Sequence, residues 1–170
     1  KLKLSDTLIR EVLLLPVRRD KALHFVDLDG TILDDNVRFE VLPELKKHRG
    51  DKAYDYITTK LSQKADVQEA FEEFMRLINP KSNLLKGYNT FFDPNNPDHS
   101  ILTAGNELFQ SLKIDATELP IPKNRQLLVL DANLKPQKML EYFLQIGYIP
   151  WKIRFFDDRI DNFEGIDREL

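Results

Sequence analysis

Two aspartates separated by a single residue, Asp27 and Asp29, lie in the stretch HFVDLDGTILDD at residues 24–35. Gly30 and Thr31 follow them directly. Glycine permits a sharp turn at this point, and the threonine hydroxyl can fix that turn. Carboxylates placed this close together repel one another unless something cationic offsets their charges. The spacing therefore indicates a site with a chemical role.

Other residues with reactive or charged side chains follow apolar runs later in the chain. Thr103 ends the run in ILTAGN, Lys135 stands in NLKPQKML, and Asp157 and Asp158 follow the run in IRFFDDRIDN. Taken alone, each has a structural explanation, such as a threonine at a strand end, a lysine on a helix surface or a helix N-cap. Together with Asp161, however, the last two acids again concentrate negative charge, which requires a cation.

The elements that must position these residues are predicted from hydrophobic spacing. Apolar residues at helical intervals alternate with short apolar runs bounded by turn residues. The alternation predicts an α/β fold in which helices cover both faces of a parallel sheet and ligands collect at the carboxyl ends of the strands. The expected strands are residues 22–27, 100–103, 126–130 and 152–156, and the expected helices are residues 5–15, 106–113 and 136–147.

A long stretch in the middle of the chain differs in character. Apolar residues recur at helical intervals through residues 36–78. Residues 79–99 are dense in Asn, Pro and Asp, which indicates a loop with a short extended piece at residues 88–92. The expected domains are a core formed by residues 1–35 and 99–170, and a mainly helical insert formed by residues 36–98.

In this order and spacing, the motifs resemble those of the haloacid dehalogenase (HAD) superfamily. Its hallmarks are an apolar strand running into DxDGT, a strand ending in Ser or Thr, a Lys heading a helix, and a strand ending in two acids. The resemblance implies a Rossmann-like core, an insert that caps the active site, and Mg²⁺-dependent hydrolysis of phosphomonoesters. It makes Asp27 the nucleophile that forms an aspartyl-phosphate, and Asp29 the general acid and base.

The resemblance also implies which residues hold the phosphate and the metal. Thr103 and Lys135 would bind the phosphoryl group, with Lys138 as the alternative lysine three residues on. Oxygen ligands suit Mg²⁺. The implied ligands are Asp27, the backbone carbonyl of Asp29, and Asp158, assisted by Asp157 or Asp161.

Composition limits the partners. A net charge of -3 gives no basic excess, so nucleic acid is not an expected partner. The absence of cysteine removes disulfides, thiolate metal sites and a cysteine nucleophile, and it fits a reducing compartment. No apolar run approaches the roughly twenty residues of a membrane span, so we expect a soluble, cytoplasm-like setting, with a secreted effector acting in a host cytoplasm left open. The sequence begins without Met, from which we expect a piece of a longer protein.

Two alternatives to a phosphatase of small metabolites stay open. The same chemistry would act on phosphotyrosine in proteins, as in some HAD-type phosphatases. Alternatively, the chain would be a catalytically inactive module that binds phosphate or a partner. The expected partner is accordingly a phosphorylated small molecule or a phosphoprotein. The intact set that favours activity over the inactive module is Asp27, Asp29, Thr103, Lys135 and Asp158.

Overall fold

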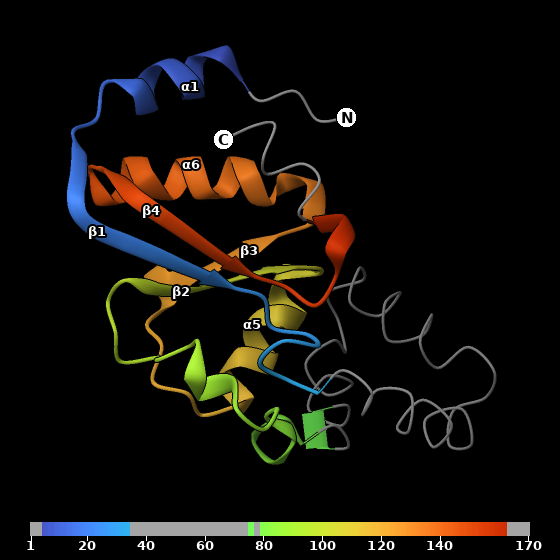
Figure 1. Cartoon of the computed structure of the whole chain (residues 1–170). Coiled ribbons are helices and arrows are strands. Elements are labelled where there is room, and N and C mark those ends of the chain that lie inside the picture. The colour runs from blue at the N-terminus through green and yellow to red at the C-terminus, as the bar shows by residue number, and fades with distance from the viewer. Residues whose placement is uncertain (1–4, 35–74, 77–78, 163–170) are drawn as a thin grey trace.

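The computed structural model of the chain describes residues 5–34, 75–76 and 79–162. Within these residues, strands and helices alternate as predicted, with one helix ahead of the first strand (Figure 1). The strands are β1 (Val17–Val26), β2 (His99–Ala104), β3 (Gln126–Val129) and β4 (Ile149–Phe156). The helices are α1 (Asp6–Leu13), α5 (Glu107–Ala116) and α6 (Lys135–Ile146).

The four strands form one sheet in the order β3-β2-β1-β4. Every neighbouring pair is parallel, so the carboxyl ends of the strands meet at one edge of the sheet. The predicted α/β class with a parallel sheet is therefore confirmed. Val26 of β1 pairs with Ile101 of β2 and with Phe156 of β4. Consequently, the residues that follow Val26 and Phe156 in the sequence are neighbours at this edge.

Helices cover both faces of the sheet, as predicted. Figure 1 shows α1 and α6 on one face and α5 on the other. Successive residues of a strand point to opposite faces, and β1 supplies both cores in this way. Phe25 belongs to a buried cluster with Val12 of α1 and Met139 of α6, and Val26 belongs to a second cluster with Ile114 of α5. No helix in the described part of the chain is long and apolar enough to cross a membrane.

The first strand begins earlier than predicted, at Val17 instead of Ala22. Its exposed first half contains Arg18 and Asp20, which lie between the expected helix at residues 5–15 and the expected strand at residues 22–27. Polar residues are tolerated there because this half of β1 pairs with β4 alone, whereas the described pairing with β2 starts at His24. Arg18 and Asp20 form an exposed ion pair at 2.7 Å.

The last part of the predicted insert packs against the core. It contains two short 3-10 turns, at Pro80–Asn83 and Tyr88–Thr90. The extended piece expected at residues 88–92 is therefore wrong, because the carbonyl of Gly87 accepts the backbone N–H of Thr90 and closes a turn. Phe92 is fully buried in the cluster that contains Val26.

Much of the predicted insert, namely residues 36–74 and 77–78, lies outside the described residues. The same is true of residues 163–170 at the C-terminal end. The division into a core and a mainly helical insert therefore stays a prediction.

Candidate active site

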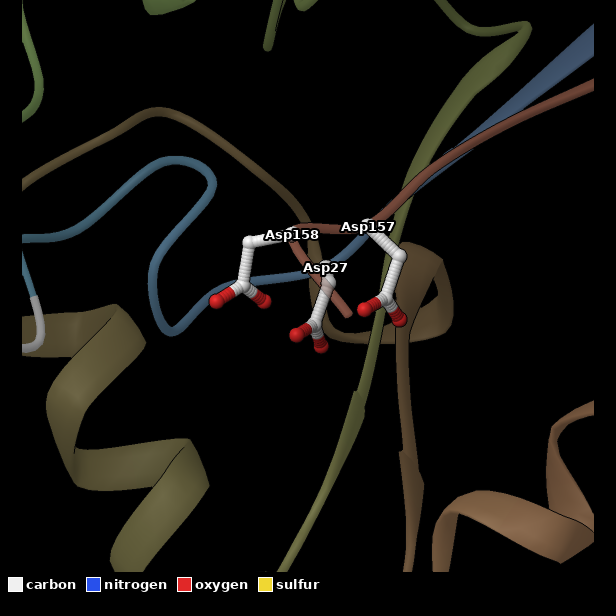
Figure 2. A group of neighbouring side chains, drawn as sticks. All are labelled: Asp27, Asp157 and Asp158. Atoms are coloured by element: carbon white, nitrogen blue, oxygen red, sulfur yellow. The ribbon is translucent and has the colours of Figure 1, made fainter. Parts of the chain in front are cut away.

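The predicted acids meet at the carboxyl edge of the sheet. Asp27 follows β1, and its backbone N–H donates to the carbonyl of Phe156 at 2.8 Å. Asp157 and Asp158 follow β4 directly. One carboxylate oxygen from each of Asp27, Asp157 and Asp158 lies within 4.8 Å of the other two, and Figure 2 shows the three side chains extending in the same direction. We call these three residues the aspartate cluster.

Lys135 supplies a cation to this cluster. Its Nζ lies 3.1 Å from Asp27 Oδ1 and 2.6 Å from Asp157 Oδ2, and the residue is 1% exposed. The position follows from the helix start, because Lys135 is the first residue of α6 and Pro136 occupies the first turn, where proline is favoured. The alternative lysine, Lys138, lies near Glu141 on the helix surface at 3.6 Å. The fold thus brings Lys135 to the acids, and Lys138 makes a surface pair instead.

Asp157 is held in place by several donors. Besides Lys135, the backbone N–H of Arg159 donates to its Oδ1 at 2.9 Å. Asn162 Nδ2 donates to Oδ1 at 2.8 Å and to Oδ2 at 2.9 Å. The Asp157 side chain is completely buried, whereas Asp161, the alternative named from the sequence, is exposed and does not belong to the cluster. Most of the capacity of Asp157 to accept hydrogen bonds is therefore already used.

Asp158 is the exposed member of the cluster. Its carboxylate lies against Gly30: a Cβ added at Gly30 would stand 2.3 Å from Asp158 Oδ2. The φ of +75° at Gly30 is also one that residues with a side chain rarely adopt. Glycine is thus required both by the turn and by the close approach of the acid. In the described part of the chain, the Asp158 carboxylate accepts no hydrogen bond, which leaves its oxygens available to a ligand.

The turn after Asp29 is held by the backbone. The N–H of Leu33 donates to the carbonyl of Leu28 at 2.8 Å, and the N–H of Gly30 donates to the carbonyl of Leu33 at 2.8 Å. The hydroxyl of Thr31 is buried and has no hydrogen-bond partner among the described residues. The prediction that this hydroxyl fixes the turn is therefore wrong.

Asp29 is close to the cluster in sequence, but its carboxylate is engaged elsewhere. Lys113 Nζ of α5 lies 2.5 Å from Asp29 Oδ2 in an ion pair. Gln110, one turn earlier on α5, donates to the same oxygen at 3.1 Å. The roles foreseen for Asp29, as general acid and base and through its carbonyl as a metal ligand, stay predictions.

Thr103 lies near the carboxyl end of β2 and is 1% exposed. Its neighbour two residues earlier, Ile101, pairs with Val26, so Thr103 lies level with the start of the turn that follows β1. In the described part of the chain, the Thr103 hydroxyl makes no hydrogen bond to another residue. Its position at the carboxyl edge agrees with the sequence, and its phosphate-binding role stays a prediction.

Burial dominates the electrostatics of Asp27, which is 7% exposed. Burial raises the pKa of the Asp27 carboxyl to about 6, and Lys135 opposes this effect, while Asp157 and Asp29 add to it. The buried Oδ1 is in ion-pair contact with Lys135 but accepts no aligned hydrogen bond in the described part of the chain. A further positive charge would therefore stabilise the Asp27 carboxylate.

A divalent cation fits these residues. The cluster offers three carboxylates against the single ammonium of Lys135, so its charges are not balanced within the described residues. Asp27 has a carboxylate oxygen that accepts no hydrogen bond within the described residues, and the carboxylate of Asp158 is exposed. These groups provide the hard oxygen ligands that Mg²⁺ prefers.

The raised pKa of Asp27 predicts how stability depends on pH in the absence of metal. Between its ordinary value near 4 and its folded value of about 6, the folded chain holds a proton that the unfolded chain releases. Stability contributed by this group is therefore present at low pH and is lost as pH rises through the window. We expect the unfolding free energy of the metal-free chain, measured against an Asp27→Asn variant, to fall by about 2 kcal/mol between about pH 4.5 and about pH 7. Urea titrations at the two pH values check this, and a difference that is constant or rises with pH would contradict it.

An open depression of about 350 Å³ adjoins the cluster. Its polar side includes Asp157 and Asp158, and its apolar side is formed by Phe91, Phe155 and Phe156. The rings of Phe91 and Phe156 are stacked, with centroids 5.1 Å apart. A ligand with a charged end and a flat apolar end would match this lining.

Sequence reasoning missed Lys113, Gln110 and Asn162. Lys113 and Gln110 lie three residues apart on α5, so they share one face of the helix. That spacing was visible, but nothing in it distinguished them from solvated helix residues. Asn162 follows the DDRIDN segment without any feature of its own.

Comparison with known proteins supports the fold. A solved structure of a haloacid dehalogenase-like hydrolase from Burkholderia xenovorans LB400 matches with a TM-score of 0.57 and 20% sequence identity, over 87% of this chain and 77% of that one. No protein-family model matches the chain, and a search of curated proteins finds no match. At this identity the similarity shows the fold alone. The resemblance to the HAD superfamily is therefore confirmed at the level of the fold.

Proposed function

We propose that this chain is a Mg²⁺-dependent phosphomonoester hydrolase of the HAD type, acting through an aspartyl-phosphate on Asp27. The observation that carries the proposal is the position of Asp27. Its buried carboxylate lies beside the ammonium of Lys135 on one side and beside the carboxylate of Asp158 on the other. A nucleophile next to a fixed cation and a metal ligand is the arrangement that phosphoryl transfer requires.

In the first step, a carboxylate oxygen of Asp27 attacks phosphorus. A new O–P bond forms, the P–O bond to the ester oxygen breaks, and the departing oxygen takes a proton from Asp29. Lys135 stabilises negative charge on the phosphoryl oxygens without having to move, because it is already fixed by Asp157 at 2.6 Å. The hydroxyl of Thr103 donates to another phosphoryl oxygen.

In the second step, Asp29 takes a proton from a water molecule, whose oxygen attacks phosphorus. The bond between phosphorus and Asp27 breaks, and inorganic phosphate leaves. Asp27 is regenerated as a carboxylate beside Lys135.

Asp27, Asp158 and the backbone carbonyl of Asp29 would hold Mg²⁺, and Asp157 would assist them. Bound Mg²⁺ neutralises charge on the carboxylates and on the transferred phosphoryl group. The donors already bound to Asp157 favour a role in which it orients Lys135.

Metal dependence provides a direct test of this function. We expect EDTA to stop turnover of p-nitrophenyl phosphate and Mg²⁺ to restore it. Asp158→Asn removes one anionic ligand, so the Mg²⁺ concentration for half-maximal rate should rise by at least about tenfold. Asp115→Asn, which changes an exposed aspartate of α5, is the matched control and should leave this concentration unchanged. Turnover that is indifferent to chelation would reject the metal.

The depression beside the cluster supports a second candidate, in which the same chemistry acts on phosphotyrosine in proteins. Its apolar side, with Phe91 and Phe156, suits a phenyl group better than a sugar. A panel of sugar phosphates, nucleotides and phosphotyrosine peptides would distinguish the candidates by kcat/KM. If no ester in the panel is hydrolysed with Mg²⁺, both hydrolase candidates are wrong, and the inactive binding module is favoured.

A further inference from the structure

Two histidines contact the segment that forms one side of the depression. His24 of β1 and His99 of β2 are paired by the strand register, and their rings stack with centroids 4.1 Å apart. Phe91, which lines the depression, has its backbone carbonyl oxygen 3.4 Å from His24 Nδ1. The backbone N–H of Asp93 donates to His99 Nδ1 at 2.9 Å. We call residues 91–93 the wall segment, and both of these contacts attach it to the sheet.

The hydrogen bonds determine which ring nitrogens carry a proton. A backbone N–H can only donate, so His99 Nδ1 accepts from Asp93 and carries no proton. Arginine also only donates, so His24 Nε2, which lies 2.7 Å from Arg154 Nη1, is an acceptor as well. A charged imidazole has a proton on both nitrogens. The attachment of Asp93 therefore exists only while His99 is uncharged.

The surroundings of His99 oppose a positive charge on its ring. Burial lowers the pKa of His99 from its ordinary value near 6.5, and the neighbouring His24 and Arg125 act in the same direction. The acids nearby oppose this effect without outweighing it. The charged and titratable groups around the stacked rings are Asp93, Asp98 with its partner Lys21, Arg125, Arg154 and His24. An opened wall segment, which frees the ring, thus takes up a proton more readily than a closed one, so acid favours opening.

The second half of the same loop is held by a donor that does not titrate. Arg125 donates to the backbone carbonyl of Pro94 at 2.7 Å and to that of His99 at 2.8 Å. It also donates to the carbonyl of Asn96. A guanidinium keeps its charge throughout the pH range in which proteins are folded. Acid therefore acts on the wall segment and leaves the part of the loop held by Arg125 in place.

We infer that His99 is a positioning residue that fastens the wall segment to the sheet in its uncharged form and releases it on protonation. The fastening is a property of the fold, whereas its effect on a substrate rests on the proposed function. Phe91 supplies part of the apolar side of the depression and stacks on Phe156, with centroids 5.1 Å apart. Loss of the Asp93 attachment loosens this side, so acid weakens the binding of a flat apolar group beside the aspartate cluster.

Amide hydrogen exchange of the full chain, followed by NMR, tests the fastening without any activity. The protection factor of the Asp93 N–H should fall by about five- to tenfold between about pH 7.5 and about pH 5.5, since a freed imidazole with an ordinary pKa is then mostly protonated. The N–H of Ile149, which donates to the carbonyl of Pro16 at 2.9 Å, is the control and should keep its protection. Unchanged protection of Asp93, or an equal fall at both amides, would overturn the inference.

Two substitutions separate the proton from the ring. His99→Asn offers Asp93 an amide oxygen that is not protonated in this range, so the protection of Asp93 should no longer depend on pH. His99→Phe keeps a ring but offers no acceptor, so the protection should be low at both pH values. A protection that still falls with pH in His99→Asn would overturn the inference.

A third variant decides if neither of these folds. His24→Gln removes the neighbouring ring and should raise the pKa of His99, which NMR titration measures directly. The fall in Asp93 protection should then move to higher pH by the same amount. A fall that does not move with the pKa of His99 would overturn the inference.

Turnover separates the fastening from the proposed function. With Mg²⁺ present, the KM for p-nitrophenyl phosphate should rise on acidification more in the wild-type chain than in His99→Asn, whereas kcat should change equally in both. An equal rise in KM would overturn the effect on the substrate. A wild-type chain without turnover at any pH would contradict the proposed function, and the exchange measurement would then support or overturn the fastening by itself.

Discussion

Replacement of Asp27 by asparagine is expected to abolish Mg²⁺-dependent hydrolysis, with kcat falling by at least about 10³-fold. An amide oxygen is a poor nucleophile and would not form the aspartyl-phosphate, so the route through a covalent intermediate is lost. The substitution keeps the size of a side chain that is 7% exposed, so it leaves no cavity behind. The measurement is steady-state turnover of p-nitrophenyl phosphate at saturating Mg²⁺.

The fold of this variant should survive, which separates loss of chemistry from loss of structure. Because burial raises the pKa of Asp27 to about 6, its charge destabilises the metal-free chain at neutral pH. The unfolding free energy of the metal-free Asp27→Asn variant should therefore be no lower than that of the wild-type chain. Asp20→Asn, on the exposed half of the same strand, is the control and should keep full activity. Retained hydrolysis in Asp27→Asn would remove Asp27 as the nucleophile.

Replacement of Lys135 by methionine is expected to affect both stability and rate. Methionine keeps most of the length of the side chain but removes the ammonium that lies between Asp27 and Asp157. Breaking a buried ion pair by removing one partner typically costs about 3–5 kcal/mol, because the remaining charge is left uncompensated. In addition, kcat should fall by about 10²- to 10³-fold, since a preorganised positive charge near the phosphoryl oxygens is lost. Urea unfolding in EDTA and turnover in Mg²⁺ measure the two effects.

A control and a rescue distinguish the charge of Lys135 from its packing. Lys138→Met changes the surface lysine one turn further along α6 and should alter the unfolding free energy by less than about 0.5 kcal/mol. Adding Asp27→Asn to Lys135→Met removes one of the two uncompensated carboxylates, so part of the lost stability should return. If the double variant is as unstable as the sum of the single variants predicts, the electrostatic explanation is contradicted.

The aspartate cluster was predictable because the apolar runs and the acids that follow them define strand ends. A parallel sheet places all its carboxyl ends at one edge, and the pairing of Val26 with Phe156 then makes Asp27 and Asp157 neighbours. The sequence did not decide whether Lys135 or Lys138 is the lysine of the site, since both lie in the first turns of the same helix. Burial distinguishes them, because Lys135 is buried whereas Lys138 lies near Glu141 on the helix surface.

The contacts of α5 were not predictable in the same way. A lysine at a helical position usually keeps its charge in water, and Lys113 gives no local signal that it is buried. Its burial is compensated by the ion pair with Asp29, which is far away in the sequence. The same limitation applies to His24 and His99, whose rings stack with centroids 4.1 Å apart because the register of β1 and β2 pairs them.

The start of β1 was missed for a different reason. Hydrophobic alternation identifies strands that are covered by helices, and the first half of β1 is exposed. Arg18 and Asp20 therefore interrupt the hydrophobic pattern, although the backbone in this part of β1 pairs with β4. The hydrophobic pattern of a segment reflects its burial more than its backbone pairing. A prediction from this pattern therefore makes exposed strand ends too short.

Chemical trapping of the covalent intermediate tests the central claim most directly. Borohydride reduces an aspartyl-phosphate to homoserine, which peptide mass spectrometry locates in the sequence. After incubation with an aryl phosphate and Mg²⁺, homoserine is expected at position 27 of the wild-type chain and not in the presence of EDTA. Turnover with no modification at Asp27, or with the modification at another aspartate, would contradict the claim that Asp27 accepts the phosphoryl group.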